Sequence, residues 1–412
     1  MISRFQLKNF KSIKSADLKL GPFNLLIGTN ASGKSNFLDA LRFLQGIGWG
    51  LTIDEILNGR PRTGTGSEWE GIRGGSQELE YQEAEAKQRN RKHVGLEVDF
   101  VVKSVFDEDS FLTSNYNYGI EIDAQRGHVS EEWLSGVFDT RLVKNKPDSA
   151  SIKARYEAIS GPGKRPHIDY EKNRPLLQQI TGGRSKDDIF GLVIAREILE
   201  PFASIRRLDP QPSVLRQYSM AREVDRLGER GENFAALVQA IRSHGDEEAY
   251  LHWLRELRPE EVESVEILTG ALKEPMFALK ERGRTFPAPV LSDGTLRFAA
   301  IAAAFFQPDM PQLMMIEEIE NGVNPARMRV LMELLRNRAG QDKTQVIATT
   351  HSPLLLDWLQ KEEWKYTFLC HRDSETGATK ILPLTEIPRF NEVAEEGKIG
   401  ELLSEGWLDF AL

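Results

Sequence analysis

The chain has 412 residues, of which 40% are hydrophobic and 28% are charged, and its formal net charge at pH 7 is −9. This composition is ordinary for a folded globular protein, and it excludes a fibrous repeat, a wholly disordered chain and a surface that is basic throughout. The longest apolar run, Phe298 to Phe306, is far shorter than the roughly 18 residues that a membrane span needs.

The cellular compartment is predicted from the N-terminus and the cysteine count. The first residues, MISRFQLKNFKS, contain no uninterrupted apolar segment of the kind found in signal peptides. The single cysteine, Cys370, excludes an intramolecular disulfide and is typical of a buried thiol in a reducing compartment. We therefore expect a cytoplasmic protein with no membrane partner.

The N-terminal segment predicts strands followed by a loop and a helix. Apolar and polar residues alternate around Phe5 and again around Leu18, as they do in β-strands. Phe23 to Ile27 is a short apolar run typical of a buried strand, and the apolar residues from Phe37 to Leu44 keep helical spacing. Strand, loop and helix in this order are the context that a phosphate-binding loop requires.

The loop between that strand and that helix fits the pattern G-x-x-x-x-G-K-[ST]. Its glycines let the backbone wrap closely around phosphates, and the amides at the helix start point toward them. Lys34 would reach the β- and γ-phosphates, and the Ser35 hydroxyl would bind Mg²⁺. A chance match in a loop is the alternative, which the flanking strand and helix disfavour. The predicted nucleotide contacts are Gly28, Asn30, Ala31, Ser32, Gly33, Lys34, Ser35 and Asn36.

The middle of the chain, from about Val94 to Lys280, has the character of an insertion. Before it, the glycine-rich segment from about Thr52 to Glu80 predicts a long surface loop. The segments VGLEVDFVVK and YNYGIEID alternate as strands do, and SIKARYEAI is a third candidate strand. The segment ENFAALVQAIRSHGDEEAYLHWLREL predicts an amphipathic helical pair broken near Gly245.

Local basic clusters are the places where nucleic acid would contact an acidic chain. Each cluster is more often an ordinary solvated face than a DNA contact, so DNA remains only a possible partner. The clusters are Lys87, Arg89, Arg91 and Lys92; Lys164 and Arg165; Arg206 and Arg207; and Lys280, Arg282 and Arg284.

The C-terminal part alternates helices with buried strands. We expect a helix at Thr295–Phe306, a strand in QLMMIEE, a helix at Pro325–Arg338 and a strand in TQVIATTH. This alternation predicts a mainly parallel sheet with crossover helices. A hairpin in YTFLCHRDSETGATKILPL and a short helical tail complete the chain.

Two acids and a histidine stand at the ends of these strands. Buried strands seldom end in paired carboxylates without a cation or a reaction to serve, although a solvated strand end is the alternative. Glu317 would hold the Mg²⁺ shell, and Glu318 would orient or polarise the attacking water. His351 would bond the γ-phosphate, although a lone histidine is usually structural. Gln77 is a candidate neighbour of Mg²⁺, with an ordinary loop glutamine as the commoner case.

The sequence Leu-Ser-Asp-Gly-Thr at 291–295 opens the apolar helix late in the chain. Ser292 can cap that helix, and Gly294 allows close backbone approach to an anion. A simple helix cap is the plainer interpretation. The order of the motifs favours more, because a phosphate loop precedes this turn and the acid strand follows it.

This order resembles the ATP-binding-cassette (ABC) ATPases, and more narrowly their soluble RecF/SMC-like branch and the stand-alone ATPases related to the overcoming-lysogenization-defect (OLD) proteins. About 60 residues follow His351, too few for the nuclease domain of full OLD proteins. The resemblance is strong over about 1–77 and 289–352 and loose between them. The segments that carry it include LKNFKS, RGGSQELEY, RLDPQPS, IEEIENG and GELLSEGWL.

The resemblance implies an α/β fold: an ABC-type P-loop head with a mixed, mainly parallel sheet, plus an inserted antiparallel β element and a helical lobe. The core would comprise residues 1–77 and 289–370, the insertion residues 78–288, and the hairpin and tail residues 371–412. Relatives usually carry Pro and His where this chain has Ile319 and Asn324, which leaves the details of dimer coupling open.

The resemblance also implies how the site works. Two copies would form a head-to-tail homodimer around two ATP molecules with Mg²⁺, and Ser292 and Gly294 of one copy would cap the γ-phosphate held by the other. Lys34, Glu318 and His351 would be catalytic, and Lys11 would lie near the nucleotide. The chain would serve anti-phage defence or DNA repair with a separate effector, a nuclease or a toxin. The alternative is an ATP-loaded scaffold that sequesters such a partner, with turnover incidental.

Overall fold

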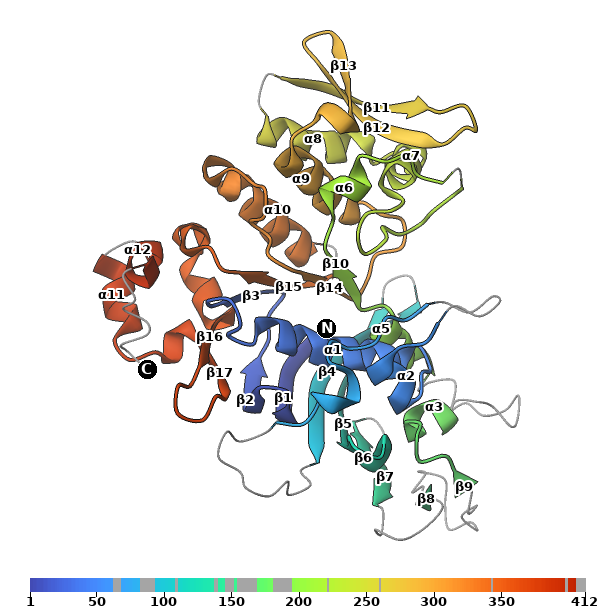
Figure 1. Ribbon diagram of the computed structural model, residues 1–412, viewed down its shortest axis with the longest axis vertical. Helices are drawn as coiled ribbons and strands as arrows, with labels where there is room; N and C mark the ends of the chain where they lie inside the picture. The colour runs from blue at the N-terminus through green and yellow to red at the C-terminus, as the bar shows by residue number, and fades with distance from the viewer. Residues whose placement is uncertain are drawn as a thin grey trace. The chain divides into compact units, whose positions relative to one another are not determined.

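The computed structural model describes residues 1–61, 68–81, 93–107, 110–136, 140–144, 152–153, 169–180, 195–220, 222–258, 261–341, 344–396 and 399–404 (Figure 1). The chain divides into two compact units. The first unit comprises Met1–Gly21, Gly28–Ile205 and Phe368–Pro383, and the second comprises Pro22–Ile27, Arg206–Thr367 and Leu384–Leu412.

The first unit is built on an antiparallel sheet of six strands in the order β2-β1-β4-β5-β6-β7. Helix α1 (Lys34–Gly48) packs on it, and the rings of Phe5 and Phe37 meet edge to face with centroids 5.4 Å apart. The sheet confirms the expected inserted antiparallel element. Its strands are β1 (Ile2–Phe10), β2 (Ile13–Lys19), β4 (Val94–Asp107), β5 (Ser110–Asp123), β6 (His128–Ser135) and β7 (Thr140–Lys144).

Smaller elements surround this sheet within the first unit. The strands β16 (Thr367–Arg372) and β17 (Thr379–Pro383) pair as the expected C-terminal hairpin. Of the candidate strand SIKARYEAI, only β8 (Ile152–Lys153) lies in the described residues. The other elements are α3 (Leu176–Ile180), the π-helical turn η2 (Ala195–Leu199), α5 (Glu200–Ala203) and β9 (Asp169–Tyr170).

The long surface loop expected between Thr52 and Glu80 is wrong in part. Residues Ile53–Asn58 form helix α2, and Gly75–Gln77 form the 3-10 turn η1. The Thr52 side chain accepts from the Glu55 backbone N–H and the Glu55 carboxylate accepts from the Thr52 N–H, a reciprocal capping box. Trp69, 3% exposed, is buried beside α2 and donates to the carbonyl of Ile56. The capping box formed by Thr52 and Glu55 therefore starts a helix here, although the segment is rich in glycine.

The second unit contains four parallel strands in the order β10-β14-β15-β3, as the alternation of helices and strands predicted. Every residue of β3, β14 and β15 is buried, which is typical of parallel strands covered on both faces. Helices α9 (Asp293–Ala304) and α10 (Met328–Gln341) connect them along the chain. The strands are β10 (Arg206–Leu208), β14 (Leu313–Ile316), β15 (Gln345–Thr350) and β3 (Phe23–Ile27).

A second layer of this unit joins a helical pair to a small antiparallel sheet (Figure 1). The predicted break at Gly245 is confirmed, because this residue ends α7 (Phe234–His244) with a left-handed φ of 89° before α8 (Glu247–Leu257) begins. Phe234 packs on Phe277 with ring centroids 4.6 Å apart. The sheet β11 (Val262–Thr269), β12 (Pro275–Glu281) and β13 (Arg284–Pro287) was not predicted.

Short elements complete the second unit. None of the helices described has the length and apolar character that crossing a lipid bilayer requires. The remaining elements are α6 (Pro212–Leu215), η3 (Ala288–Val290), η4 (Pro325–Arg327), η5 (Pro353–Trp358), η6 (Lys361–Tyr366), η7 (Leu384–Glu386), α11 (Phe390–Glu396) and α12 (Ile399–Ser404), of which the last two are the expected helical tail.

A carboxylate is completely buried in the first unit. Glu132 on β6 accepts hydrogen bonds from the Tyr118 hydroxyl (2.9 Å) and from the backbone N–H groups of Leu176 (2.6 Å) and Leu177 (3.1 Å) at the start of α3. Burial raises the pKa of Glu132 to about 7, although these three donors act to lower it.

This raised pKa predicts that stability falls as pH rises. Between the ordinary pKa of 4.5 and about 7, the folded chain binds a proton that the unfolded chain has released. Glu132→Gln should remove this dependence, because glutamine does not titrate. Denaturant unfolding at pH 5, 6, 7 and 8 measures this. The control is Glu131→Gln, a partly exposed neighbour, and parallel curves for wild type and Glu132→Gln would contradict the prediction.

Candidate functional site

The phosphate loop of the first unit requires glycine at two positions. A Cβ atom at Gly28 would lie 2.3 Å from the carbonyl oxygen of Cys370, and one at Gly33 would lie 2.3 Å from Thr379 Oγ1. Gly33 also has a left-handed φ of 103°, as does Ala31 with 62°. The β16–β17 hairpin therefore leaves the loop space for backbone alone.

The interior of this loop suits a phosphate. Lys34 Nζ lies inside the loop and donates to the carbonyl oxygens of Gly28 (2.6 Å) and Thr29 (2.8 Å). Ser32 Oγ is buried and has no hydrogen-bond partner among the described residues. The loop leads directly into the N-terminus of α1, whose amides and helix dipole favour an anion. A cation, a hydroxyl and helix-start amides thus gather in one loop and fit a triphosphate.

The other predicted loop residues differ in how firmly they are held. Asn30 and Ala31 are exposed at the tip. Asn36 Nδ2 donates to Ser12 Oγ (2.6 Å), and the Ser35 carbonyl accepts from Arg73 Nη2 (3.0 Å). The base of the loop is therefore fixed by side chains, and its tip remains open to solvent.

Lys11 is committed to an ion-pair network that the sequence did not reveal. Its Nζ lies 2.5 Å from Asp39 Oδ2 on α1 and donates to the Arg73 carbonyl (2.6 Å). Burial lowers the pKa of Lys11, while Asp39 opposes this shift. Arg73 also pairs with Asp39 (3.1 Å), which ties the segment before Gln77 to α1. Gln77 itself is exposed at the end of η1.

The acids and the histidine of the second unit follow two neighbouring parallel strands. Ile316 ends β14 opposite Ala348 of β15, and Thr350 of β15 lies opposite Ile27, the last residue of β3. The carboxyl ends of three strands therefore lie along one edge of the sheet. Glu317 and His351 directly follow two of these ends, and the phosphate loop follows the third in the sequence.

Arg207, which the sequence analysis placed in a basic cluster, pairs with acids in a way that the sequence did not predict. Its Nε donates to Glu317 Oε1 (2.7 Å) and its Nη1 lies 2.9 Å from Glu229 Oε1. Burial acts to lower the pKa of Arg207, but the charges of Glu317 and Glu229 outweigh burial and raise it. Arg206 is half-buried, and burial lowers its pKa to about 10. This basic pair is therefore partly buried, and DNA contact at these positions stays a prediction.

The sheet edge that carries Glu317 and Glu318 after β14, here called the acid edge, could hold Mg²⁺ as nucleotide sites commonly do. The described residues contain no group of three or more His, Cys, Asp or Glu side chains that would hold a metal ion. Mg²⁺ is commonly held by one or two carboxylates with substrate phosphates and water, so Glu317 suffices as the carboxylate on this edge. Glu317 and Glu318 line a pocket of about 430 Å³, together with Asp209, Gln211 and Arg297.

Glu318 is held in an unusual backbone conformation. Its φ is +46°, in the left-handed region that non-glycine residues seldom adopt. Its N–H donates to Thr349 Oγ1 (3.0 Å), and its carboxylate accepts from Asn321 Nδ2 (2.5 Å). Strain of this kind persists only where the surroundings fix it. The turn after β14 therefore holds both the backbone and the carboxylate of Glu318 in place.

His351 is oriented by Glu320, a second residue that the sequence analysis missed. Glu320 Oε1 accepts from the backbone N–H of His351 (2.8 Å) and lies 3.0 Å from its Nδ1. Glu320 is buried, whereas the His351 side chain is 42% exposed. The imidazole is thus fixed on its Nδ1 side, while the side chain stays partly open to solvent. The IEEIENG segment held this signal, because its third acid follows the first two closely.

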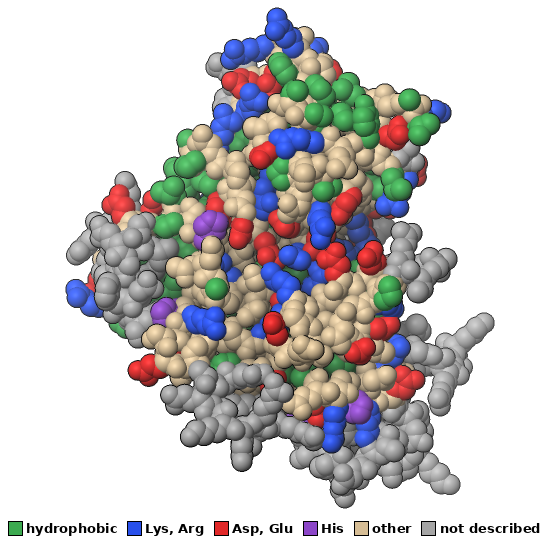
Figure 2. Space-filling view, viewed as in Figure 1, with side chains coloured by type: hydrophobic (Ala, Val, Ile, Leu, Met, Phe, Trp, Pro, Cys, Tyr) green, Lys and Arg blue, Asp and Glu red, His purple; other side chains and the backbone are tan. Residues whose placement is uncertain are grey.

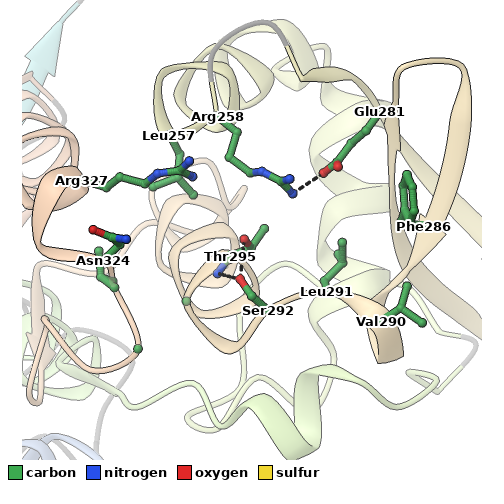
Figure 3. A pocket seen from close by; sticks show the side chains of 13 residues that line it. Leu257, Arg258, Glu281, Phe286, Val290, Leu291, Ser292, Thr295, Asn324 and Arg327 are labelled. Carbon is green, nitrogen blue, oxygen red and sulfur yellow. Dashed lines mark hydrogen bonds and ion pairs between the residues drawn. The ribbon is translucent and has the colours of Figure 1, made fainter.

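The turn at Ser292–Gly294 borders a pocket of about 600 Å³ (Figure 3). Ser292 caps α9, accepting from the Thr295 N–H (3.2 Å). A Cβ atom at Gly294 would lie 1.9 Å from the carbonyl oxygen of Gly322, in the segment after the acids. Figure 3 also shows Arg327 directed into the pocket, opposite the hydrophobic residues Phe286 and Val290.

Of the remaining basic clusters, one lies in the described residues and two lie outside them. Lys280, Arg282 and Arg284 lie at the β12–β13 hairpin, where Figure 2 shows basic side chains beside a hydrophobic face. Arg282 is 77% exposed and lies 3.7 Å from Glu261. DNA contact at this hairpin stays a prediction. The other two clusters (Lys87, Arg89, Arg91 and Lys92; Lys164 and Arg165) lie outside the described residues.

The phosphate loop, the acid edge and the parallel sheet define an ABC-type P-loop ATPase of the RecF/SMC/OLD kind. The chain belongs to the family described as "AAA domain, putative AbiEii toxin, Type IV TA system", whose model matches residues 23–357.

Curated relatives agree with this class. The chain is 22% identical over 368 residues to an "ATP/GTP phosphatase" of Helicobacter pylori, which covers 88% of each chain. It is 39% identical over 49 residues to an "OLD nuclease" of Thermus scotoductus, or 12% of this chain and 9% of that protein. It is 42% identical over 60 residues to RecF of Vibrio vulnificus, or 14% and 16% of the two chains. The last two likenesses are local.

Solved structures show the same fold. An SMC head bound to the C-terminal winged-helix domain of ScpA matches with a TM-score of 0.52 and 14% identity, covering 93% of this chain and 99% of that one. An SMC head with an extended coiled coil, bound to the C-terminal domain of ScpA derived from Pyrococcus furiosus, matches with a TM-score of 0.52, 13% identity and coverages of 96% and 98%.

The close approach of Gly294 to Gly322 yields a prediction. Gly294→Ala should destabilise the protein by about 1–3 kcal/mol, because the added methyl group would press on a backbone carbonyl. Thermal and denaturant unfolding measure this loss. The control is Gly95→Ala, where the nearest heavy atom to a new Cβ is 3.5 Å away. Equal stability of the two variants would show that the turn relaxes to accommodate the added methyl group.

Proposed function

We propose that this chain binds ATP with Mg²⁺ and hydrolyses it to ADP and phosphate. One observation carries the proposal: β3, β14 and β15 end along one edge of a parallel sheet, and the phosphate loop, the paired acids and His351 directly follow those ends. A loop that cradles phosphates and carboxylates that hold a cation are the parts that phosphoryl transfer to water requires.

Each residue has a proposed role. Lys34 moves from the loop carbonyls to the β- and γ-phosphates, and the loop amides bind the same groups. Ser35 and Glu317 hold Mg²⁺, which neutralises phosphate charge, and Gln77 is a further candidate near it. Glu318 orients the attacking water and accepts its proton, and His351 donates from Nε2 to the γ-phosphate.

We further propose that two copies close head to tail around two ATP molecules. Ser292 and Gly294 lie at the start of the 12-residue helix α9 and border an open pocket. In the closed dimer they would contact the γ-phosphate bound by the second copy. Because this contact exists only in the closed state, ATP would favour closure, and hydrolysis would remove that preference.

The biological setting belongs to the same proposal. We place the chain in anti-phage defence or DNA repair, acting with a separate nuclease or toxin. The family description names a type IV toxin–antitoxin system, and the local likenesses to an OLD nuclease and to RecF support the same area. The name of the Helicobacter pylori relative makes GTP a second nucleotide to test.

Steady-state turnover tests the proposed reaction. Phosphate release from ATP and from GTP should be measured with and without single-stranded and duplex DNA. Lys34→Ala should lose nucleotide binding, and Glu318→Gln should bind ATP but turn over about a hundredfold more slowly or less. Retained affinity in the first variant or normal turnover in the second would contradict the site. A rise with DNA identifies nucleic acid as a ligand, whereas indifference favours a nucleotide-gated scaffold.

Mixing two inactive variants tests the shared sites. Lys34→Ala removes nucleotide binding, and Ser292→Arg blocks the capping turn, so neither homodimer has a complete site. Each mixed dimer has one complete site. An equal mixture should therefore recover up to about a quarter of wild-type turnover, because half of the dimers are mixed and each of these has one of its two sites complete. Turnover no higher than that of either variant alone would exclude capping by the second copy.

A further inference from the structure

Arg297 is a buried cation that connects helix α9, which begins after Ser292, to the paired acids Glu317 and Glu318. It lies on α9, one turn after Ser292, and is 4% exposed. Its Nη1 donates to Asp209 Oδ1 (3.0 Å) and to the Pro210 carbonyl (2.9 Å). Its Nη2 donates to the carbonyl oxygens of Glu317 (2.7 Å) and Glu318 (3.3 Å).

Arg297 adds a donor to the backbone turn that follows β14. The pairing of β14 with β15 ends at Ile316, so the backbone after it leaves the sheet ladder. The left-handed turn at Glu318, whose carbonyl also accepts from the Asn321 N–H (2.9 Å), is stable only if its surroundings fix it. Arg297 supplies a charge-assisted bond to both carbonyls at once.

The contacts of Arg297 exceed what simple filling of space would require. Its Nε is buried with no hydrogen-bond partner among the described residues, which costs free energy that an apolar side chain would avoid. The start of α9 also touches the same segment at Gly294, against Gly322. The helix that carries Ser292 therefore holds the Glu317–Gly322 segment at two points, one of them through a rigid planar guanidinium.

We propose that Arg297 is a positioning residue that couples the two ATP sites of the dimer. This inference rests on the proposed function. In each copy, Ser292 contacts the nucleotide of the second copy, while Glu318 acts on the nucleotide of its own copy. Arg297 connects the two within one chain, so occupancy of one site sets the backbone that aims the carboxylate in the other.

The physical step is a change in the position of α9. Contact between its first turn and a γ-phosphate steadies the helix, and the guanidinium transmits that position to the carbonyls of Glu317 and Glu318. Such coupling is a free energy shared between two sites, so it must appear as cooperativity in nucleotide use. Without Arg297, each ATP site would hydrolyse ATP slowly and independently of the other site.

Arg297→Met and Arg297→Lys test the coupling. Methionine keeps the length of the side chain, and Asp209, 29% exposed, stays hydrated after the change. Turnover should fall about tenfold or more in Arg297→Met and less in Arg297→Lys, with ATP affinity changed little. The Hill coefficient, above 1 in wild type, should fall to 1 in Arg297→Met. Purely structural damage would lower the active fraction but leave the Hill coefficient of the remainder unchanged.

The control is Arg338→Met. Arg338 on α10 also donates to a backbone carbonyl, that of Phe305 at the other end of α9, far along the helix from the acids. This variant should lose stability and keep both turnover per folded molecule and the Hill coefficient. A wild-type Hill coefficient of 1, or an unchanged one in Arg297→Met, would overturn the proposal.

Mixed dimers decide in which copy Arg297 acts. In dimers of Lys34→Ala with Ser292→Arg chains, only the Ser292→Arg copy binds ATP at a complete site. Adding Arg297→Met to that copy should lower the recovered turnover, and adding it to the Lys34→Ala copy should not. The reverse pattern, or no effect in either copy, would overturn the role of Arg297 in positioning Glu318 of its own copy. If the wild-type protein did not hydrolyse ATP, or if Glu318→Gln were fully active, the proposed function itself would be refuted.

Discussion

The parallel register of β14, β15 and β3 is the constraint on which the rest of this protein depends. All three strands are buried on both faces, so a shift in register along the sheet would draw the polar residues that follow the strands, such as Glu317, into the core. Because the strands run in one direction, their carboxyl ends share one edge, where backbone groups leave the ladder and polar side chains become useful. The paired acids and His351 occupy the positions that this edge makes available. The chemistry of the site is therefore a consequence of strand direction.

Carboxylates at the partly buried edge of this sheet carry a desolvation free energy, and the structure offsets it through three different contacts. Arg207 neutralises the Glu317 side chain, and Arg297 bonds the carbonyls of the acid segment. Glu320 is compensated by His351, whose backbone and ring both face its carboxylate. The acids are thus held before any nucleotide arrives, which lowers the reorganisation that the reaction would need.

A head that closes on ATP and opens after hydrolysis suits a protein that signals its nucleotide state to others. In the proposed dimer, the segment after the acids, the capping turn and the pocket beside Arg327 would all lie where a second copy contacts the second unit. Changes at these surfaces would report whether ATP is bound. An effector that recognised the closed form would then need no contact with the nucleotide itself.

The sequence by itself determined the phosphate loop, the acid strand, the helix break at Gly245 and the alternation that predicts a parallel sheet, because each depends on neighbours within a few residues. The sequence also contains the capping-box residues Thr52 and Glu55 of α2, which the sequence analysis did not recognise. Only the tertiary structure decided that Arg207, 110 residues from Glu317, neutralises that acid, and that Arg297 bonds its carbonyl. The physical reason is that periodicity records which face of an element is buried, whereas the partner of a buried charge is chosen by packing between distant segments.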